Sequence, residues 1–211
     1  MRITYLKSVG STQIYLKELL KTKNVKPPHA VVCEIQTDGI GSRDNSWQGM
    51  DGNLFLSFAI SLEDLPKDLK LESSSIYFAY ILKEVLSDFG SKTFLKWPND
   101  FYIDDLKIGG MVTNIIENTL VCGVGLNLVN SPKEFTTLDI DIKKDKLLEK
   151  YFEKIEKRVP WKQVFSKYKL EFYCNQKFFT HDNNLKISLG DAELQSDGSI
   201  TVNGKRMYSL R

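Results

Sequence analysis

The 211-residue sequence predicts a fold that mixes helices with a larger number of strands, and three observations predict it. Short apolar runs follow one another between residues 93 and 126 with polar turns between them, which is typical of antiparallel hairpins. Two stretches, 74–89 and 141–177, have apolar residues at helical spacing. After residue 180 the sequence returns to short alternating runs.

The first half of the chain begins with a short apolar strand, after which the Ser11-Thr12 pair predicts the N-cap of a helix that ends before Pro27. Two apolar runs then indicate buried strands on either side of a polar loop with four glycines. Ser73 or Ser74 is expected to cap the next helix, and Gly90 stands where a C-terminal glycine belongs. The strands are expected at residues 3–6, 30–36 and 53–60, and the loop at 37–52.

The second half is expected to continue with a hairpin series, a helical region and a small β-rich module. Pro160 breaks the helical region into two parts, and Asn203-Gly204 is a strong hairpin turn signal. We predict a main domain over residues 1–180 and a small β-rich domain over 181–211. The hairpin strands are expected at residues 93–97, 101–103, 108–116 and 119–126.

Composition excludes several classes of protein. The net charge of +2 and an apolar content of 42% argue against a disordered chain and give no reason to expect nucleic acid as a partner. The apolar runs are too short to span a bilayer, and the first residues lack the apolar core of a signal peptide. Three widely spaced cysteines argue against a disulfide scaffold, so we expect a cytoplasmic protein.

Three loops contain residues suited to binding an anion. In the first loop, which follows Gln36, glycines let the backbone approach a ligand, and the Arg43 guanidinium can form two hydrogen bonds to a phosphate. The alternative is an ordinary loop with no ligand. The second is the unusual string Lys96-Trp97-Pro98-Asn99-Asp100. The third joins Lys107 and Gly109-Gly110 to a strand whose own glycines indicate close approach by a ligand or another backbone. The first loop covers residues 36–47 and the third covers residues 107–110. The end of the glycine-containing strand has the sequence Gly123-Val124-Gly125-Leu126-Asn127.

Taken together and in this order, the three loops resemble those of the biotin protein ligases. The resemblance covers residues 1 to about 130 and returns weakly in the tail, which resembles the small SH3-like C-terminal domain of the family. It implies an α+β fold of the class II synthetase type, with a mixed, mostly antiparallel sheet, helices and that small β module. The family attaches biotin to a lysine of a biotin carboxyl carrier protein, through biotinyl-5′-AMP, with ATP and Mg²⁺.

The resemblance also implies roles for individual residues. Lys107 matches the lysine between the biotin carboxylate and the α-phosphate, and Arg43 lies in the loop that closes over the adenylate, so both are expected to be catalytic. Asp100 is the candidate metal ligand. The expected biotin contacts are Ser11, Thr12, Gln36, Gly39, Trp47, Lys107, Gly109 and Gly110. The expected nucleotide contacts are Arg43, Trp97, Asn99, Asp100 and Asn127.

Two departures and two alternatives accompany this interpretation. Many family members have Gly-Arg-Gly-Arg where this chain has Gly39-Ile40-Gly41-Ser42-Arg43, so its loop has fewer cations. The pattern begins at residue 1, so we expect no DNA-binding domain, no nucleic acid or membrane partner, and a monomer or homodimer. The alternatives are a lipoate-type protein ligase and a catalytically inactive binding relative. The absence of a triple-glycine loop favours biotin over lipoate.

Overall fold

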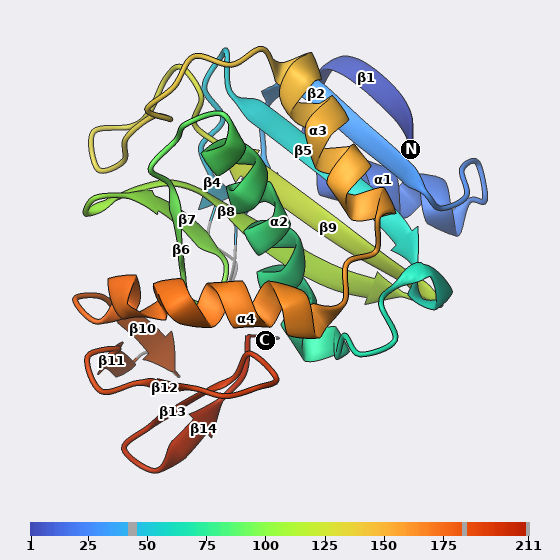
Figure 1. Ribbon diagram of the computed structural model, residues 1–211. Coiled ribbons are helices and arrows are strands. Elements are labelled where there is room, and N and C mark those ends of the chain that lie inside the picture. The colour runs from blue at the N-terminus through green and yellow to red at the C-terminus, as the bar shows by residue number, and fades with distance from the viewer. Residues whose placement is uncertain (42–45, 183–184, 210–211) are drawn as a thin grey trace.

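A seven-stranded mixed sheet forms the centre of the computed structural model, which describes residues 1–41, 46–182 and 185–209 (Figure 1). The strand order is β1-β2-β5-β9-β8-β7-β6, with β1 parallel to β2 and the other neighbouring pairs antiparallel. The α+β class and the mostly antiparallel mixed sheet are therefore confirmed. The strands are β1 (Arg2–Val9), β2 (His29–Gln36), β5 (Leu54–Ser61), β6 (Phe94–Lys96), β7 (Asp100–Ile103), β8 (Leu106–Ile116) and β9 (Thr119–Leu126).

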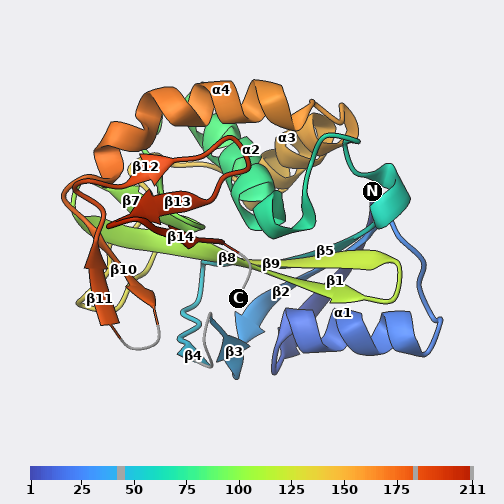
Figure 2. The same ribbon diagram turned by 90° about the horizontal axis from the view of Figure 1, so that it is seen from below.

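Helices cover the two faces of this sheet unequally. Figure 2 shows α2 (Ser74–Asp88), α3 (Lys144–Glu156) and α4 (Trp161–Glu171) on one face, and α1 (Thr12–Lys21) on the other. The three helices on the first face are rich in buried apolar residues, and the main core lies between them and the sheet. On the second face only a small cluster lies under α1, formed by Leu16, Val31, Ala59 and Val121. The rest of that face is available for a site.

Alternation along β5 divides its side chains between the two faces. Leu56 and Phe58 point into the main core, while Ala59 belongs to the cluster under α1. The Phe58 ring packs edge-to-face against three aromatic rings of α2 and α3, with centroid distances of 5.4, 5.8 and 6.2 Å. A run of eight apolar and small residues thus anchors the sheet to its helices.

Helix ends agree fully with the sequence predictions in two of three cases. The Ser11 hydroxyl accepts a hydrogen bond from the backbone N–H of Ile14 at 3.4 Å, as an N-cap does, and Gly90 follows α2 with a φ of +94°. At the start of α2 the predicted position is confirmed, since Ser73 is the N-cap residue, but the capping bond is not made. The Ser73 hydroxyl donates instead to the carbonyl of Asp197. A short 3-10 turn, Leu71–Ser73, leads into the helix there.

Short strands outside the central sheet occupy the tail and the glycine-rich loop. In the tail, β10 (Phe179–Asp182) pairs with β11 (Leu185–Ser188), and β12 (Glu193–Leu194), β13 (Ile200–Val202) and β14 (Lys205–Met207) form a second small sheet. The predicted Asn203-Gly204 turn joins β13 to β14, with φ values of 50° and 75°. In the loop, β3 (Gly39–Ile40) pairs with β4 (Ser46–Trp47), where only loop was predicted.

The tail strands pack against the main core. Ile200, Val202 and Met207 belong to the same buried cluster as the helices on the first face of the sheet. The indole N–H of Trp97 donates to the carbonyl of Gly198 at 2.9 Å, and that of Trp161 donates to the carbonyl of Ser196 at 2.9 Å. The predicted boundary at residue 180 falls inside β10, and the division into two domains stays a prediction.

The remaining one-turn helices are Leu62–Asp64 and, after α4, Phe172–Asn175. As predicted, Pro160 divides the helical region into two helices, and it stands directly before the second of them, α4. None of the described helices is both long and apolar enough to cross a membrane.

The core on the α2 face predicts a large difference between two leucine truncations. Leu82 is fully buried in α2, whereas Leu170 is 77% exposed on α4. We expect Leu82→Ala to lower the free energy of unfolding by about 2–5 kcal/mol, because it leaves a cavity in close-packed surroundings. Leu170→Ala is the matched control and should change it by less than about 0.5 kcal/mol. Urea unfolding followed by circular dichroism measures both, and equal effects of the two variants would contradict the assigned core.

Candidate functional site

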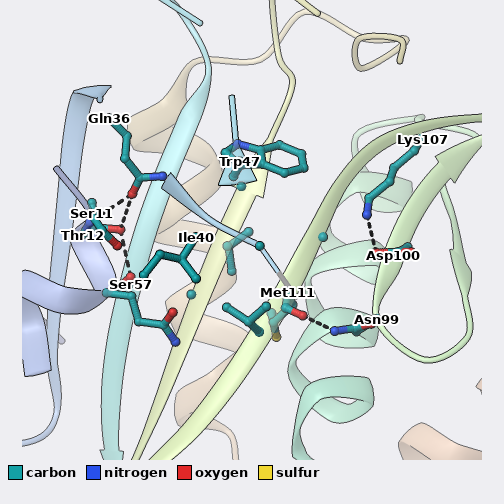
Figure 3. Close-up of a pocket in the computed structure, with 17 residues that line it drawn as sticks. Ser11, Thr12, Gln36, Ile40, Trp47, Ser57, Asn99, Asp100, Lys107 and Met111 are labelled. Atoms are coloured by element: carbon teal, nitrogen blue, oxygen red, sulfur yellow. Dashed lines mark hydrogen bonds and ion pairs between the residues drawn. The ribbon is translucent and has the colours of Figure 1, made fainter. Parts of the chain in front are cut away.

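A pocket opens on the face of the sheet that α1 only partly covers. The first turn of α1, the β3–β4 hairpin, β8 and β9 surround it, with the β6–β7 turn at one end (Figure 3). The structure brings together eight residues that the sequence singled out, although they come from four separate segments of the chain. They are Ser11, Thr12, Gln36, Trp47, Asn99, Asp100, Lys107 and Gly110.

One end of the pocket holds a network of neutral hydrogen-bonding groups (Figure 3). The Gln36 side-chain oxygen accepts from the backbone N–H of Thr12 at 3.0 Å and from its hydroxyl at 3.1 Å. The same hydroxyl lies 2.9 Å from the hydroxyl of Ser57. All three side chains are at least nine-tenths buried. Because their partners lie within the network, the orientation of these groups is established before any ligand arrives.

The other end holds one carboxylate between two lysines. Lys107 Nζ lies 2.6 Å from one oxygen of Asp100, and Lys96 Nζ lies 3.6 Å from the other. The Lys107 side chain is 24% exposed, so its charge is only partly screened by water. Burial and the Asp100 carboxylate raise the pKa of the neighbouring Tyr102 to about 12, so this phenol stays neutral at physiological pH.

Glycines keep the floor of the pocket free of side chains. Gly125 pairs with Gly110 across β8 and β9, and Gly123 pairs with Val112 and with Ser57. A Cβ on Gly125 would lie 2.6 Å from Cε2 of the Trp47 indole, closer than atoms can approach. The indole therefore lies directly against bare backbone, and only glycine fits beneath it.

Trp47 covers the middle of the pocket and contacts both sides of it. Its ring packs edge-to-face on Phe135 with centroids 6.2 Å apart, and the Lys107 ammonium lies 6.0 Å from the indole centroid. The indole N–H is buried and has no hydrogen-bond partner in the described part of the chain. Gly39 supports this arrangement from behind, since a Cβ there would lie 2.4 Å from the Trp47 carbonyl oxygen.

Four of the predicted site residues that the structure describes do not line this pocket. Gly39 backs its wall, and Gly109 lies against the Gly125 carbonyl, where a Cβ would be 2.5 Å away. The Asn127 side chain bonds Asn53 and the carbonyl of Thr136. The structure thus gives Gly109 and Asn127 packing and loop-bracing contacts. Arg43 lies outside the described residues.

Trp97 departs most clearly from its expected place as a nucleotide contact. It is fully buried in the main core. Its backbone N–H donates to the side chain of Asn175 at 2.6 Å, and its indole N–H reaches the tail at Gly198. The physical reason is a large apolar surface at the end of β6, which is more stable beneath the helices than in a polar cleft. A direct nucleotide contact from this side chain therefore has no support in the geometry.

Sequence reasoning missed several lining residues. Gln13 follows two predicted residues on α1, and Ser57 lies in a strand interpreted only as core. A signal for Ser57 existed, because it is the one hydroxyl between Leu54 and Ile60, on the opposite face to Phe58. The other lining residues that were not assigned a role are Ile40, Gly41, Met111, Val112, Gly123, Val124 and Gly125.

The described residues contain no cluster of three or more histidine, cysteine, aspartate or glutamate side chains suited to holding a metal ion. Asp100 is the one carboxylate in the described lining, and both of its oxygens face lysines. A divalent cation at Asp100 would have to displace at least one of them, so the described part of the site does not form a dedicated metal cage.

The first part of the chain is similar in sequence to known proteins. Residues 5–129 match the biotin/lipoate A/B protein ligase family. The bifunctional ligase/repressor BirA of Escherichia coli is 31% identical over 133 residues, which cover 60% of this chain. This match spans only 40% of that relative's length, and the other curated relatives are matched over similar shares.

Solved structures match over nearly the whole chain. The biotin acetyl coenzyme A carboxylase synthetase of Helicobacter pylori, with bound biotinylated ATP, has a TM-score of 0.94 at 42% identity, covering 98% of this chain and 99% of that one. The biotin protein ligase of Aquifex aeolicus in complex with biotin and ATP has a TM-score of 0.77 at 22% identity, covering 100% and 96%. The second match concerns the fold alone.

The glycine beneath Trp47 leads to a spectroscopic prediction. We expect Gly125→Ala to push the indole out of its place and toward water, shifting its fluorescence emission to longer wavelength. Gly123→Ala is the matched control on the same strand, because the three atoms nearest to its Cβ would belong to Gln13 and Val112, at 3.2–3.3 Å. Trp47→Phe identifies the contribution of Trp47 to the spectrum. Identical spectra for both alanine variants would contradict the contact.

Proposed function

Because this chain belongs to the biotin/lipoate A/B protein ligase family, we propose that it is a biotin protein ligase, which uses ATP to attach biotin to a lysine of a carrier protein. The proposed carrier is the biotin carboxyl carrier protein of acetyl-CoA carboxylase. The H. pylori structure supports this choice, since that protein is named for acetyl coenzyme A carboxylase and its structure holds biotinylated ATP. We propose that the reaction takes place in the cytoplasm, where ATP is available.

One observation carries the proposal: the pocket is divided into a neutral polar end, an apolar middle and a cationic end (Figure 3). Biotin has the same three parts in the same order, namely a ureido group, an apolar bicycle with its methylene chain, and a carboxylate. The Gln36 and Thr12 groups suit the ureido oxygen and N–H groups, and Trp47 suits the apolar rings. Lys107 then stands where the carboxylate would lie.

The same division favours biotin over lipoate. The dithiolane ring of lipoate has no hydrogen-bonding groups, so it would leave the buried polar end without a partner from the ligand. Buried polar groups that lose access to water without gaining a partner cost about 1–3 kcal/mol each. A lipoate-type ligase would therefore be expected to have an apolar end where Gln36, Thr12 and Ser57 lie.

Lys107 is proposed to bring two anions together. In the first step a biotin carboxylate oxygen forms a bond to the α-phosphorus of ATP, and the bond from that phosphorus to the bridging oxygen breaks, releasing pyrophosphate. In the second step the neutral amine of the carrier lysine attacks the acyl carbon, the amine loses a proton, and AMP leaves. The cation of Lys107 offsets repulsion between carboxylate and phosphate and stabilises the charge that develops between them.

Asp100 is proposed to hold Lys107 in place until the substrates arrive. Its 2.6 Å contact keeps the ammonium at the edge of the pocket, and a ligand carboxylate competes for the same cation. Lys96 then remains near the freed Asp100 carboxylate, which limits the cost of breaking the pair. Mg²⁺ is proposed to enter with the triphosphate of ATP, and Asp100 is the carboxylate of the described lining that would be available to it.

Exchange of labelled pyrophosphate into ATP tests the first step without a carrier. Wild-type protein should catalyse exchange that requires biotin and ignores lipoate. Lys107→Ala should reduce it by about 100-fold or more, because the charge between the two anions is lost. Lys150→Ala is the control, since Lys150 pairs with Glu153 on the exposed side of α3. Exchange with lipoate alone would replace the proposal by the sister activity, and exchange with neither would indicate a binding protein.

The polar end leads to a second prediction, measured as biotin affinity by calorimetry. Thr12→Val keeps the shape of the side chain but removes the hydroxyl that joins Gln36 to Ser57. We expect the Kd for biotin to rise by about tenfold, because the buried Gln36 oxygen loses one of its two donors and the Ser57 hydroxyl loses its partner in the network. Thr22→Val, at the exposed end of α1, is the matched control and should leave it unchanged. Unaltered affinity in Thr12→Val would mean that the ureido group does not lie at this end.

A further inference from the structure

Positive charge is concentrated at the beginning of the chain. Residues 1–28 contain six of the 29 lysine and arginine residues but only one of the 27 acidic residues, Glu18. This segment therefore has a net charge of +5, while the remaining 183 residues together have −3. The small net charge of the whole protein conceals this asymmetry. An asymmetry of this kind creates a local field that attracts negatively charged partners.

These six cations are not neutralised within the described protein. Among the described residues, no salt bridge within 4.0 Å joins any of them to a carboxylate. The basic residues of α3 and the segment after it differ, because Lys150, Lys154 and Arg158 each pair with an acidic side chain. Residues 141–177 also have a net charge of +5, from 11 basic and 6 acidic residues, but five of these 11 cations pair with carboxylates.

Four of the six cations lie on α1 and the loop that follows it. We call Lys17, Lys21, Lys23 and Lys26 the α1 basic surface; the last three are exposed and Lys17 is half-buried. Burial and the charge of Lys21 lower the pKa of Lys17, so the two ammonium groups lie close enough to repel each other. With ten residues, α1 extends about 15 Å from the pocket to Lys21.

The α1 basic surface connects directly to the pocket. The first turn of the helix, with Ser11, Thr12 and Gln13, forms one wall of the pocket. Gln13 Nε2 donates to Asn114 Oδ1 at 3.1 Å, and Lys17 Nζ donates to the same oxygen at 2.7 Å. The row of cations thus begins one helical turn from the pocket wall and runs away from it.

We propose that the α1 basic surface is the docking site for the acidic surface of the carrier protein whose lysine accepts biotin. This inference rests on the proposed function and adds where the macromolecular substrate binds. A domain of about 100 residues has a radius of gyration of about 13 Å, so a carrier seated on α1 can cover the helix and still extend a lysine into the pocket. Ile14, which is 41% exposed on the first turn, supplies an apolar contact inside the charged rim.

Charge alone would also suit a nucleic acid, but position favours the carrier. The second step requires a protein amine to enter the pocket, and the α1 basic surface adjoins the pocket wall. A nucleic acid bound along α1 would have no reason to lie beside a small-molecule site. Four exposed or half-buried cations also form a small patch, of the size expected for steering a protein partner.

The test compares two double variants with the same change in charge. Lys21→Glu/Lys23→Glu alters the α1 basic surface, and Lys157→Glu/Lys169→Glu alters exposed lysines associated with α3 and α4, on the opposite face of the sheet. Two rates are measured for each: pyrophosphate exchange with biotin and ATP, and transfer of biotin to an apo biotin carboxyl carrier domain of acetyl-CoA carboxylase. Exchange needs no carrier, so it reports whether the pocket and the proposed function are intact.

The first variant should retain exchange but lose about tenfold or more in kcat/KM for the carrier domain, while the control variant retains both. Transfer by the wild-type protein should also weaken between 50 and about 300 mM salt more steeply than exchange does. Unchanged transfer in the first variant, or an equal loss in the control, would overturn the docking site. Double-stranded DNA binding that depends on Lys21 and Lys23, with transfer unaffected, would overturn it in favour of a nucleic acid. If the wild-type protein catalyses no pyrophosphate exchange with biotin and ATP, the proposed function is refuted instead.

Discussion

The site depends on the close approach of side chains to bare backbone on one face of β8 and β9. Gly125 supports the Trp47 indole, and Gly123 lies between Ser57 and Val112 in the next cross-strand row. A larger residue at either glycine would fill part of the pocket. Removing side chains from a sheet weakens its packing, so the opposite face has to supply the stability. The main core between the sheet and α2, α3 and α4 does so.

The cationic end of the pocket shows how a half-buried lysine is kept in place. Desolvating an ammonium group is costly unless a carboxylate accompanies it, and Asp100 accompanies two. These three described side chains, one anion and two cations, sum to an excess charge of +1 beside the pocket. An incoming carboxylate or phosphate would reduce that excess, so anionic ligands are favoured over neutral ones of the same shape. The glycine floor and this charge together determine which molecules the pocket can hold.

The tail strands contribute to the site indirectly. The Trp97 indole and the Asn175 side chain join the end of β6 to the tail and to the segment after α4. Because Lys96 and Asp100 lie on either side of Trp97 and pair across the β6–β7 turn, this anchoring limits where the charged residues can lie. A residue in the middle of the most specific motif thus acts through packing, while Asn99 and Asp100 of the same motif line the pocket.

Local patterns in the sequence were sufficient to predict the helices, the hairpin series and the residue types of the site. The reason is that helix capping, alternation of apolar residues and turn formation depend on residues only a few positions apart. Ser11 as a cap, the break at Pro160 and the Asn203-Gly204 turn are examples. Only the tertiary structure decided which neighbours in a motif face the same way. Gly110 lines the pocket and Gly109 does not, and Asp100 turns toward it while Trp97 turns into the core. Ser57 lies in the site because its strand pairs with β9, which is more than 60 residues away along the chain. No local sequence pattern predicts a pairing between segments so far apart.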